Sequence, residues 1–271
     1  MLVSSAPPRT LGVADPRVRF GPESQTADGQ LGRRLVFLDE RPAFELSFWC
    51  GTCQFLFQRL EGANGTTSLA ELEVQMADGL ESVDDAVVER FAQLLPRGQY
   101  VPLLLEVQPE LVYPAGGHDY FSVEQVATWG LNTFWGLPEH PHTPYYRTYT
   151  TPVDRQAQLF EFVVPMVPPT WNDPIRVEAH AQTLAASSRP TAVAVSLLDV
   201  CAPAAGDGVD PYTHWGLTHF VLDGHHKLQA AAETGRPLQL LSLLSVDASL
   251  ASTAQVATAL QVRRQPAEAR A

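Results

Sequence analysis

The feature that most constrains the fold is a run of strand, tight turn, helix and strand near the C-terminus. An apolar stretch over residues 214–222 predicts a strand that leads directly into Asp223-Gly224. The helix predicted for residues 225–234 ends at Gly235 in the C-cap position, and another buried strand is predicted over residues 238–246. Together with the elements described below, this run predicts an α+β protein.

The pentapeptide Asp223-Gly224-His225-His226-Lys227 opens this helix and predicts a nucleotide or phosphate site. Glycine lets the backbone turn sharply and lets a ligand approach without a Cβ in the way. The first turn of a helix carries unpaired N–H groups and the positive end of the helix dipole, so it favours anions. Two imidazoles and an ammonium group oppose that dipole, at a cost on the order of a few tenths of a kcal/mol each, which an anionic ligand would offset. Asp223 is expected to cap the helix, to hold a metal ion or to accept a proton.

The alternative interpretation of the pentapeptide is structural. In that case Asp223 caps the helix, one histidine packs inward and Lys227 is solvated. His214 and His219 flank the preceding strand; if either faced the loop, it would join the two histidines of the pentapeptide in a cluster suited to phosphate or a divalent metal.

Residues 160–246 resemble the ParB/sulfiredoxin-like superfamily, which includes the N-terminal domains of partition proteins, sulfiredoxins and free-serine kinases. The resemblance lies in a proline-punctuated strand over residues 164–168, a strand after Arg189-Pro190, and the segment HFVLDGHHKLQAAAETGRPLQLL over residues 219–241. The pentapeptide is similar to the DGHHR signature of the kinase-like members. Lys227 stands where arginine is usual, so a point charge replaces a bidentate phosphate contact.

The resemblance implies a mixed-sheet lobe that binds ATP or another nucleoside phosphate with Mg²⁺. The motif aspartate is important for catalysis in the kinase-like members, so Asp223 is the corresponding catalytic candidate, and Asp173 is a candidate for a second acidic residue. We predict His225 as a second catalytic residue. The residues predicted to contact the nucleotide or its phosphate are Gly224, His225, His226 and Lys227.

Two hypotheses follow from the pentapeptide. The first is an enzyme, a phosphotransferase or nucleotide hydrolase that acts on a small molecule, in which Asp223 positions Mg²⁺ or acts as a base. The second is a non-catalytic module whose partner contacts respond to nucleotide.

The segment Trp49-Cys50-Gly51-Thr52-Cys53 supports a third hypothesis, a thiol redox or zinc protein. It is superficially similar to a thioredoxin active site, although the upstream βαβ context is missing. Cys50 and Cys53 also have the spacing of half a zinc site, which needs two more ligands. Their structural interpretation is two packed thiols in an aromatic-rich strand and turn.

Charge and composition limit the partners. Lys and Arg total 18 against 30 Asp and Glu, a formal charge of −12, and the sequence contains no basic run that would neutralise phosphates. We therefore expect no nucleic acid and no anionic membrane surface as partner, and a small molecule or nucleotide instead. The chain has no stretch of about 20 apolar residues, no secretory signal and three cysteines. These features predict a soluble, cytoplasmic protein, and they do not indicate an oligomeric state.

Composition and periodicity divide the chain into two lobes, with a helix at residues 83–95 in the first and a second helix that Asp173 and Pro174 begin. Trp129, Trp135 and Trp171 are interpreted as core or loop anchors. The predicted segments are a flexible leader at 1–34, an N-terminal α+β lobe at 35–135, a proline- and aromatic-rich connection at 136–158, the ParB/sulfiredoxin-like lobe at 159–250, and a terminal helix and tail at 251–271.

Overall fold

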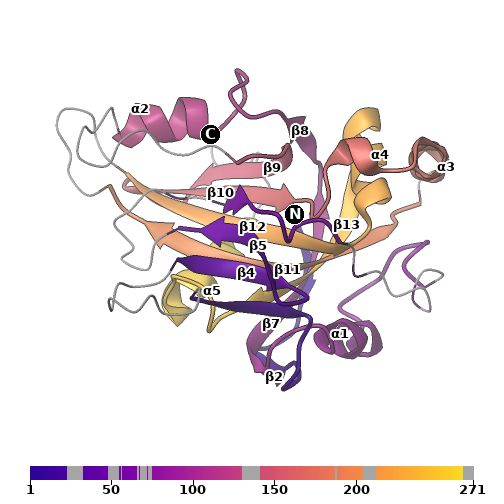
Figure 1. Cartoon of the computed structure of the whole chain (residues 1–271), viewed down its shortest axis with the longest axis horizontal. Helices are drawn as coiled ribbons and strands as arrows, with labels where there is room; N and C mark the ends of the chain where they lie inside the picture. The colour runs from indigo at the N-terminus through magenta and orange to yellow at the C-terminus, as the bar shows by residue number, and fades with distance from the viewer. Residues whose placement is uncertain are drawn as a thin grey trace.

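The structure is a computed structural model that describes residues 1–22, 33–47, 55, 57–65, 67, 72, 75–129, 141–186, 188–203 and 212–264 (Figure 1). The strands are β1 Leu2–Ser5, β2 Arg9–Leu11, β3 Val18–Pro22, β4 Arg34–Leu38, β5 Arg41–Leu46, β6 Phe57–Arg59, β7 Gly98–Val107, β8 Glu110–Val112, β9 Tyr145–Pro152, β10 Ala157–Val164, β11 Thr191–Cys201, β12 Thr213–Asp223 and β13 Leu238–Ser245. The helices are α1 Asp85–Ala92, α2 Val126–Trp129, α3 Pro174–Ala185, α4 His225–Thr234 and α5 Thr253–Arg264.

In the described ranges the strands form a nine-stranded mixed sheet and a four-stranded antiparallel sheet. The large sheet has the order β1-β7-β13-β11-β12-β10-β9-β8, with β2 beside β7. Its β10–β12 and β11–β13 pairs are parallel, and the others are antiparallel. The small sheet has the order β3-β4-β5-β6. The predicted α+β class is confirmed.

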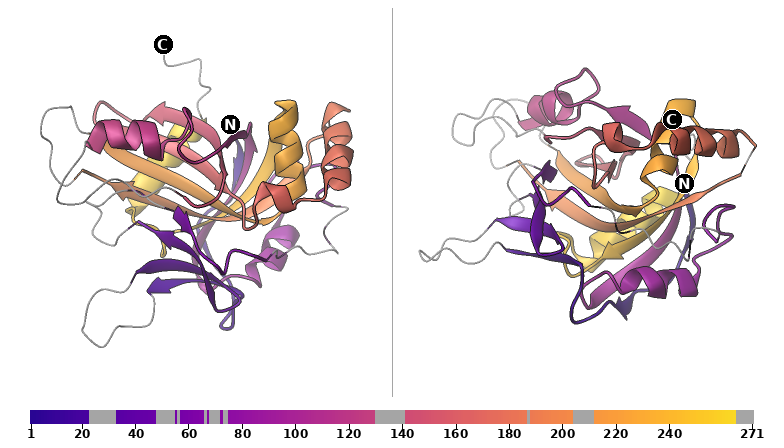
Figure 2. Two further views of the ribbon diagram at one scale, coloured as in Figure 1. Left: turned by 45° about the horizontal axis from the view of Figure 1, so that its top comes forward. Right: turned by 45° about the vertical axis from the view of Figure 1, so that its right-hand side comes forward.

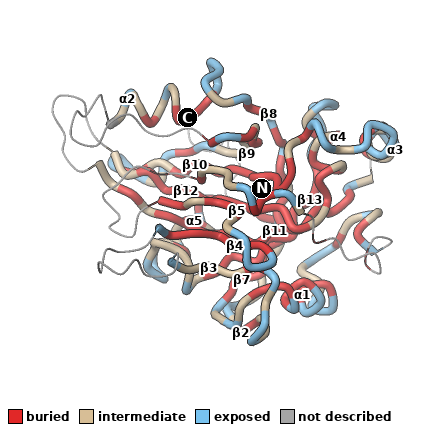
Figure 3. Tube along the Cα trace, in the orientation of Figure 1, coloured by how far each residue is buried: buried red, intermediate tan, exposed pale blue. Residues whose placement is uncertain are grey.

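The large sheet is buried on both faces, as the red strands at the centre of Figure 3 show. Side chains of β13 alternate between the two faces, because the side-chain period of a strand is two. Leu241 and Leu243 join a core cluster with the small sheet and α1. Leu240 and Leu244 join a second cluster with α3, α4 and α5. The small sheet with α1 therefore covers one face, and three helices cover the other.

The predicted flexible leader at residues 1–34 is wrong for its described part. Residues 2–22 contain β1, β2 and β3, and their side chains Leu2, Leu11 and Val18 are buried. Both β1 and β2 form backbone hydrogen bonds with β7, a long buried strand. This pairing explains why a polar, proline-containing segment forms strands. Residues 23–32 of the predicted leader lie outside the described residues.

The two predicted lobes share one sheet. Strand β7 comes from the N-terminal half, yet it lies between β1 and β13. The connection predicted at residues 136–158 contains β9, which pairs with β8 and β10. Tyrosine and threonine residues dominate β9, and their preference for extended backbone accounts for a strand in a segment that composition suggested was irregular.

The predicted helices around the candidate site are confirmed. The side chain of Asp173 caps α3 by accepting from the Ile175 N–H, and Pro174 is the first helical residue. Helix α4 covers residues 225–234 as predicted and ends at Gly235 in the left-handed conformation. The predicted terminal helix corresponds to α5. None of the helices in the described ranges is both long enough and apolar enough to cross a membrane.

A buried ion pair joins α5 to the large sheet. Glu161 on β10 and Arg263 on α5 are almost completely inaccessible, with exposed fractions of 0% and 2%. The Arg263 Nε lies 2.9 Å from one carboxylate oxygen, and a terminal guanidinium nitrogen lies 3.0 Å from the other. The Thr148 hydroxyl donates to the same carboxylate at 2.6 Å. The helix is therefore fixed on the sheet by a charge pair that water does not reach.

The polar contacts continue across the same face of the sheet. The Nε2 atom of His219 lies 3.5 Å from Glu161, and its Nδ1 atom lies 2.6 Å from the Ser196 hydroxyl. The Ser242 hydroxyl lies 2.7 Å from that of Ser196. All four side chains are buried. Because no substrate can reach the serine hydroxyls, we assign this row a structural role.

A second buried ion pair joins the two sheets. Arg34 on β4 contacts both carboxylate oxygens of Asp199 on β11, at 2.6 and 2.8 Å. The Ser47 hydroxyl and the Leu250 N–H also donate to Asp199, at 2.9 and 3.0 Å. The bidentate contact and the two further donors satisfy a carboxylate that would otherwise be costly to bury.

Candidate functional site

Helix α4 begins with an open N-terminus. Gly224 has φ 97° and occupies the N-cap position, and the helix has no side-chain cap. The first helical hydrogen bond runs from the Leu228 N–H to the Gly224 carbonyl, so the N–H groups of residues 225–227 have no acceptor within the helix. Gly224, and not Asp223, therefore occupies the N-cap position. The neighbouring helix α3 differs, because Asp173 caps it.

Gly224 is required by geometry as well as by conformation. A Cβ added there would lie 2.7 Å from the Cβ of Ala192 and 2.9 Å from its Cα. The turn therefore lies too close to β11 for a residue with a side chain, and glycine fits because it has no Cβ.

His225 is almost completely buried, with an exposed fraction of 5%. Its Nε2 accepts a hydrogen bond from the Met166 N–H at 3.1 Å, so Nδ1 carries the proton of the neutral ring. Burial, assisted by His226, lowers the pKa of His225 to about 4. The ring is therefore neutral at pH 7 and fastens α4 to the end of β10. Its Nδ1 has no hydrogen-bond partner in the part of the chain that the structure describes.

His226 is partly exposed, and its Nε2 accepts a hydrogen bond from the Asp173 N–H at 3.1 Å. Burial lowers the pKa of His226, and the nearby Arg176 charge lowers it further, while Asp173 and Asp223 act in the opposite direction. His226 is therefore a neutral donor through Nδ1. Arg176 is the cation whose charge lowers the pKa of His226.

Lys227 is buried, with an exposed fraction of 4%. Its ammonium group donates to the Thr191 carbonyl at 2.9 Å and lies 3.4 Å from the Met76 carbonyl. Backbone carbonyls therefore satisfy a charge that would be costly to bury alone. The expectation that Lys227 is solvated is wrong. Its charge lies beneath the loop, against the carbonyl groups of Thr191 and Met76.

The predicted loop residues line one pocket of about 210 Å³ between α3 and α4, which lie side by side in Figures 1 and 2. The pocket combines the open helix terminus, the Asp223 carboxylate and the cationic Arg176. The lining residues are Val167, Trp171, Asn172, Arg176, His180, Asp223, Gly224, His225, His226 and Lys227. The arrangement suits a small anion that needs N–H donors and one strong positive charge.

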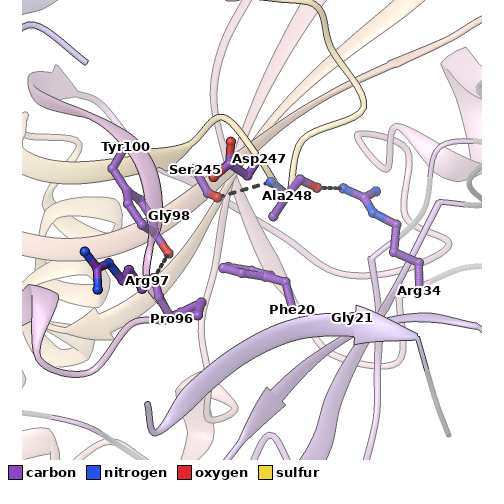
Figure 4. A pocket seen from close by; sticks show the side chains of 10 residues that line it. All are labelled: Phe20, Gly21, Arg34, Pro96, Arg97, Gly98, Tyr100, Ser245, Asp247 and Ala248. Carbon is purple, nitrogen blue, oxygen red and sulfur yellow. Dashed lines mark hydrogen bonds between the residues drawn. The ribbon is translucent and has the colours of Figure 1, made fainter. Parts of the chain in front are cut away.

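A second hollow of about 220 Å³ lies at the junction of the two sheets (Figure 4). The Tyr100 hydroxyl donates to the Pro96 carbonyl at 2.9 Å, and the Ala248 N–H donates to the Ser245 hydroxyl at 3.3 Å. Arg34 donates to the Ala248 carbonyl. These polar groups are bonded to the protein, and the predicted loop residues do not line this hollow.

His214 and His219 do not join the pocket. Tyr120 contacts the Nδ1 atom of the buried His214, and Ser196 contacts that of His219. Among the described residues, no group of three or more His, Cys, Asp or Glu side chains could hold a metal ion. A site for Mg²⁺ would therefore depend on ligand oxygens in addition to Asp223.

Cys50 and Cys53 lie outside the described residues, and so do the neighbouring Trp49, Gly51 and Thr52. The third cysteine, Cys201, is buried in β11. Burial, with a contribution from Asp199, raises the pKa of the Cys201 thiol to about 12. Cys201 therefore stays protonated at neutral pH and is a poor third ligand for zinc.

Two residues that line the pocket, Trp171 and Arg176, were not predicted as site residues. Trp171 was interpreted as a core or loop anchor, but 61% of it is exposed at the pocket mouth. Arg176 lies in the first turn of α3, where a cation opposes the helix dipole. The loop was predicted as a site because cations in the first turn of a helix are unfavourable without an anionic ligand, and the same argument applies to Arg176. No sequence signal identified Trp171.

Comparisons of the chain with protein-family models, with curated proteins and with solved structures found no match.

Proposed function

We propose that the pocket at the first turn of α4 binds the phosphate groups of a nucleotide. The observation that carries this proposal is the convergence of an uncapped helix N-terminus with the Arg176 guanidinium in one pocket of about 210 Å³. The N–H groups at the start of α4 would donate to phosphate oxygens, and Arg176 would contribute a charge-assisted hydrogen bond. The resemblance of residues 160–246 to the ParB/sulfiredoxin-like superfamily supports a nucleotide as the ligand.

The loop residues have distinct roles in this proposal. Gly224 brings the backbone close to the ligand, and His226 donates through Nδ1. His225 acts as a positioning residue, because its Nε2 bond to Met166 fixes the helix terminus. Lys227 contributes a positive charge from beneath the loop without direct contact. Asp223 would hold Mg²⁺ together with phosphate oxygens, a ligand set that suits this ion.

An enzyme and a nucleotide-responsive module differ in the fate of the ligand. In an enzyme, Asp223 would position Mg²⁺ or accept the proton of an attacking hydroxyl group or water. In a module, nucleotide would bind and leave unchanged. We favour the enzyme because a carboxylate lies in the same pocket as the phosphate donors. We propose a cytoplasmic location as well, because nucleotides are abundant there.

Arg176→Ala is expected to weaken the binding of ADP and ATP by about tenfold or more, since a hydrogen bond to a charged group contributes roughly 1.5–3 kcal/mol. Arg176 is exposed in the first turn of α3, whose cap is Asp173, so the variant should fold. Isothermal titration calorimetry with and without Mg²⁺ measures the affinity, and analysis of the recovered nucleotide reports turnover.

Arg97→Ala is the matched control. Arg97 is an exposed arginine that lines the hollow of Figure 4, so its loss should leave nucleotide affinity unchanged. Absence of binding by the wild-type protein would contradict the proposal. Equal losses in the two variants would contradict it as well, because they would indicate attraction by overall charge. Nucleotide binding without turnover would support the binding site and contradict the proposal that the protein is an enzyme.

A further inference from the structure

Trp171 is an exposed aromatic side chain at the mouth of the pocket. Its exposed fraction is 61%, and that of Ile175, at the start of the adjoining helix, is 79%. Tryptophan is usually largely buried, because its ring removes a large apolar area from water when it packs. An exposed indole beside a polar pocket is a surface that a flat ligand group can cover.

Hydrogen bonds fix the segment that follows Trp171 against the first turns of α4. The Asn172 side chain donates to Gln229 at 2.7 Å and lies 3.4 Å from the His225 carbonyl. The Asp173 N–H donates to His226 at 3.1 Å. Trp171 itself closes the short helical turn Pro169–Trp171. The indole is therefore attached to a backbone whose position relative to the helix N-terminus is set before any ligand arrives.

One side of the indole already has a neighbour. The guanidinium of Arg59, at the end of β6, lies 5.9 Å from the centre of the Trp171 ring. Arg59 is itself oriented by the Ala63 carbonyl and the Asn64 side chain, each at 2.6 Å. Since 61% of Trp171 is exposed, the contact with Arg59 leaves most of the side chain accessible to a ligand. The stack would place Trp171 between a cation and a base.

We propose that Trp171 stacks on the base of a nucleoside 5′-phosphate whose phosphate lies at the start of α4. This inference rests on the proposed function and defines its ligand class, which excludes inorganic phosphates and simple sugar phosphates as the preferred ligand. The size of the pocket supports it. Pockets for drug-sized ligands usually have volumes of roughly 300–1,000 Å³, so a pocket of about 210 Å³ would hold the phosphate end and leave the base outside. Trp171 lines the pocket and is exposed, so its ring is available to such a base.

The test compares ADP, ribose 5-diphosphate and pyrophosphate by isothermal titration calorimetry. The wild-type protein is expected to bind ADP about tenfold more tightly than ribose 5-diphosphate, which lacks only the base, since stacking of one base contributes roughly 1–3 kcal/mol. Trp171→Ala should remove this preference and leave pyrophosphate affinity unchanged. Trp171→Phe should restore much of it, because phenylalanine also presents a ring face. Both variants change an exposed side chain, so both should fold.

The outcomes separate this inference from the proposed function. If pyrophosphate binds and Trp171→Ala keeps the preference for ADP, the stacking role is wrong and the phosphate pocket stands. An equal loss of ADP and pyrophosphate binding in Trp171→Ala would also overturn the stacking role, because the base would not account for the loss. If the wild-type protein binds none of the three ligands, both the pocket and the stacking role are wrong.

Discussion

Arg263→Ala is expected to lower the free energy of unfolding by about 3–5 kcal/mol, the usual cost of leaving one member of a buried ion pair without its partner. Burial alone raises the pKa of Glu161, but the charge of Arg263 and the contacts with His219 and Arg263 hold the pKa well below its usual range. In the variant, the buried carboxylate loses its closest counter-charge. Urea denaturation at pH 7 measures the change.

Arg264→Ala is the matched control for this result. Arg264 is the next residue of α5 and is exposed, where its side chain lies 3.1 Å from the Ser5 hydroxyl. Its loss should change the unfolding free energy by less than about 0.5 kcal/mol. The double variant Glu161→Gln with Arg263→Met removes both charges and should recover most of the lost stability. Equal stabilities of Arg263→Ala and Arg264→Ala would show that the pair contributes nothing.

The Glu161–Arg263 pair should also affect how the free energy of unfolding changes with pH in the acidic range. Because the folded-state pKa of Glu161 is depressed, its contribution is present above the unfolded pKa of about 4.3 and is lost as pH falls below it. The Arg263→Ala variant should therefore lose less stability than the wild-type protein over that range.

Gly224→Ala is expected to lower the free energy of unfolding by about 2–5 kcal/mol. A left-handed backbone costs a residue with a Cβ roughly 1–2 kcal/mol, and overpacking adds roughly 1–3 kcal/mol. Both terms apply, because φ is 97° and the new Cβ would lie 2.7 Å from that of Ala192. Thermal and urea unfolding measure the loss.

Gly235→Ala separates the cost of the left-handed backbone from the cost of overpacking. Gly235 ends the same helix with φ 62°, and a Cβ there would meet nothing within 4 Å. Only the conformational term applies, so the expected loss is about 1–2 kcal/mol. If the two variants lose the same stability, the close approach of the loop to β11 is not a constraint on the site.

The sequence predicted the elements around the candidate site because their signals are local. Asp173 before Pro174 marks the start of α3, and Gly235 marks the end of α4. Short apolar runs marked β11, β12 and β13. Each of these signals depends on residues within a few positions of the element, so no knowledge of tertiary contacts was needed.

The organisation of the sheet could not be predicted in the same way. Segments β1 and β2 are short, and they are strands because β7 offers them a hydrogen-bonding edge. The pairing of β7 with β13 joins residues more than 130 positions apart and merges the two predicted lobes. Partners at that separation leave no periodic pattern in a single sequence.

The candidate site was predicted in part. The loop position, its glycine and the start of the helix follow from the sequence, since Gly224 and the short connection are local features. The orientations of His225 and Lys227 depend on Met166 and Thr191, which are distant in sequence. Chemistry alone therefore suggested direct phosphate contacts from His225 and Lys227, whereas the structure bonds His225 to the Met166 N–H and buries the Lys227 ammonium group. Arg176, from a different helix, is a further cation that lines the pocket.

The most direct measurement is a ¹H–¹⁵N NMR titration of the protein with ADP. The account predicts saturable shifts of the backbone amide signals of His225 and His226, because their N–H groups would bind the phosphate. The amide signals of Gly98 and Ala248, at the hollow of Figure 4, should not move. Unchanged signals of His225 and His226 at saturating ADP would contradict the phosphate site at α4.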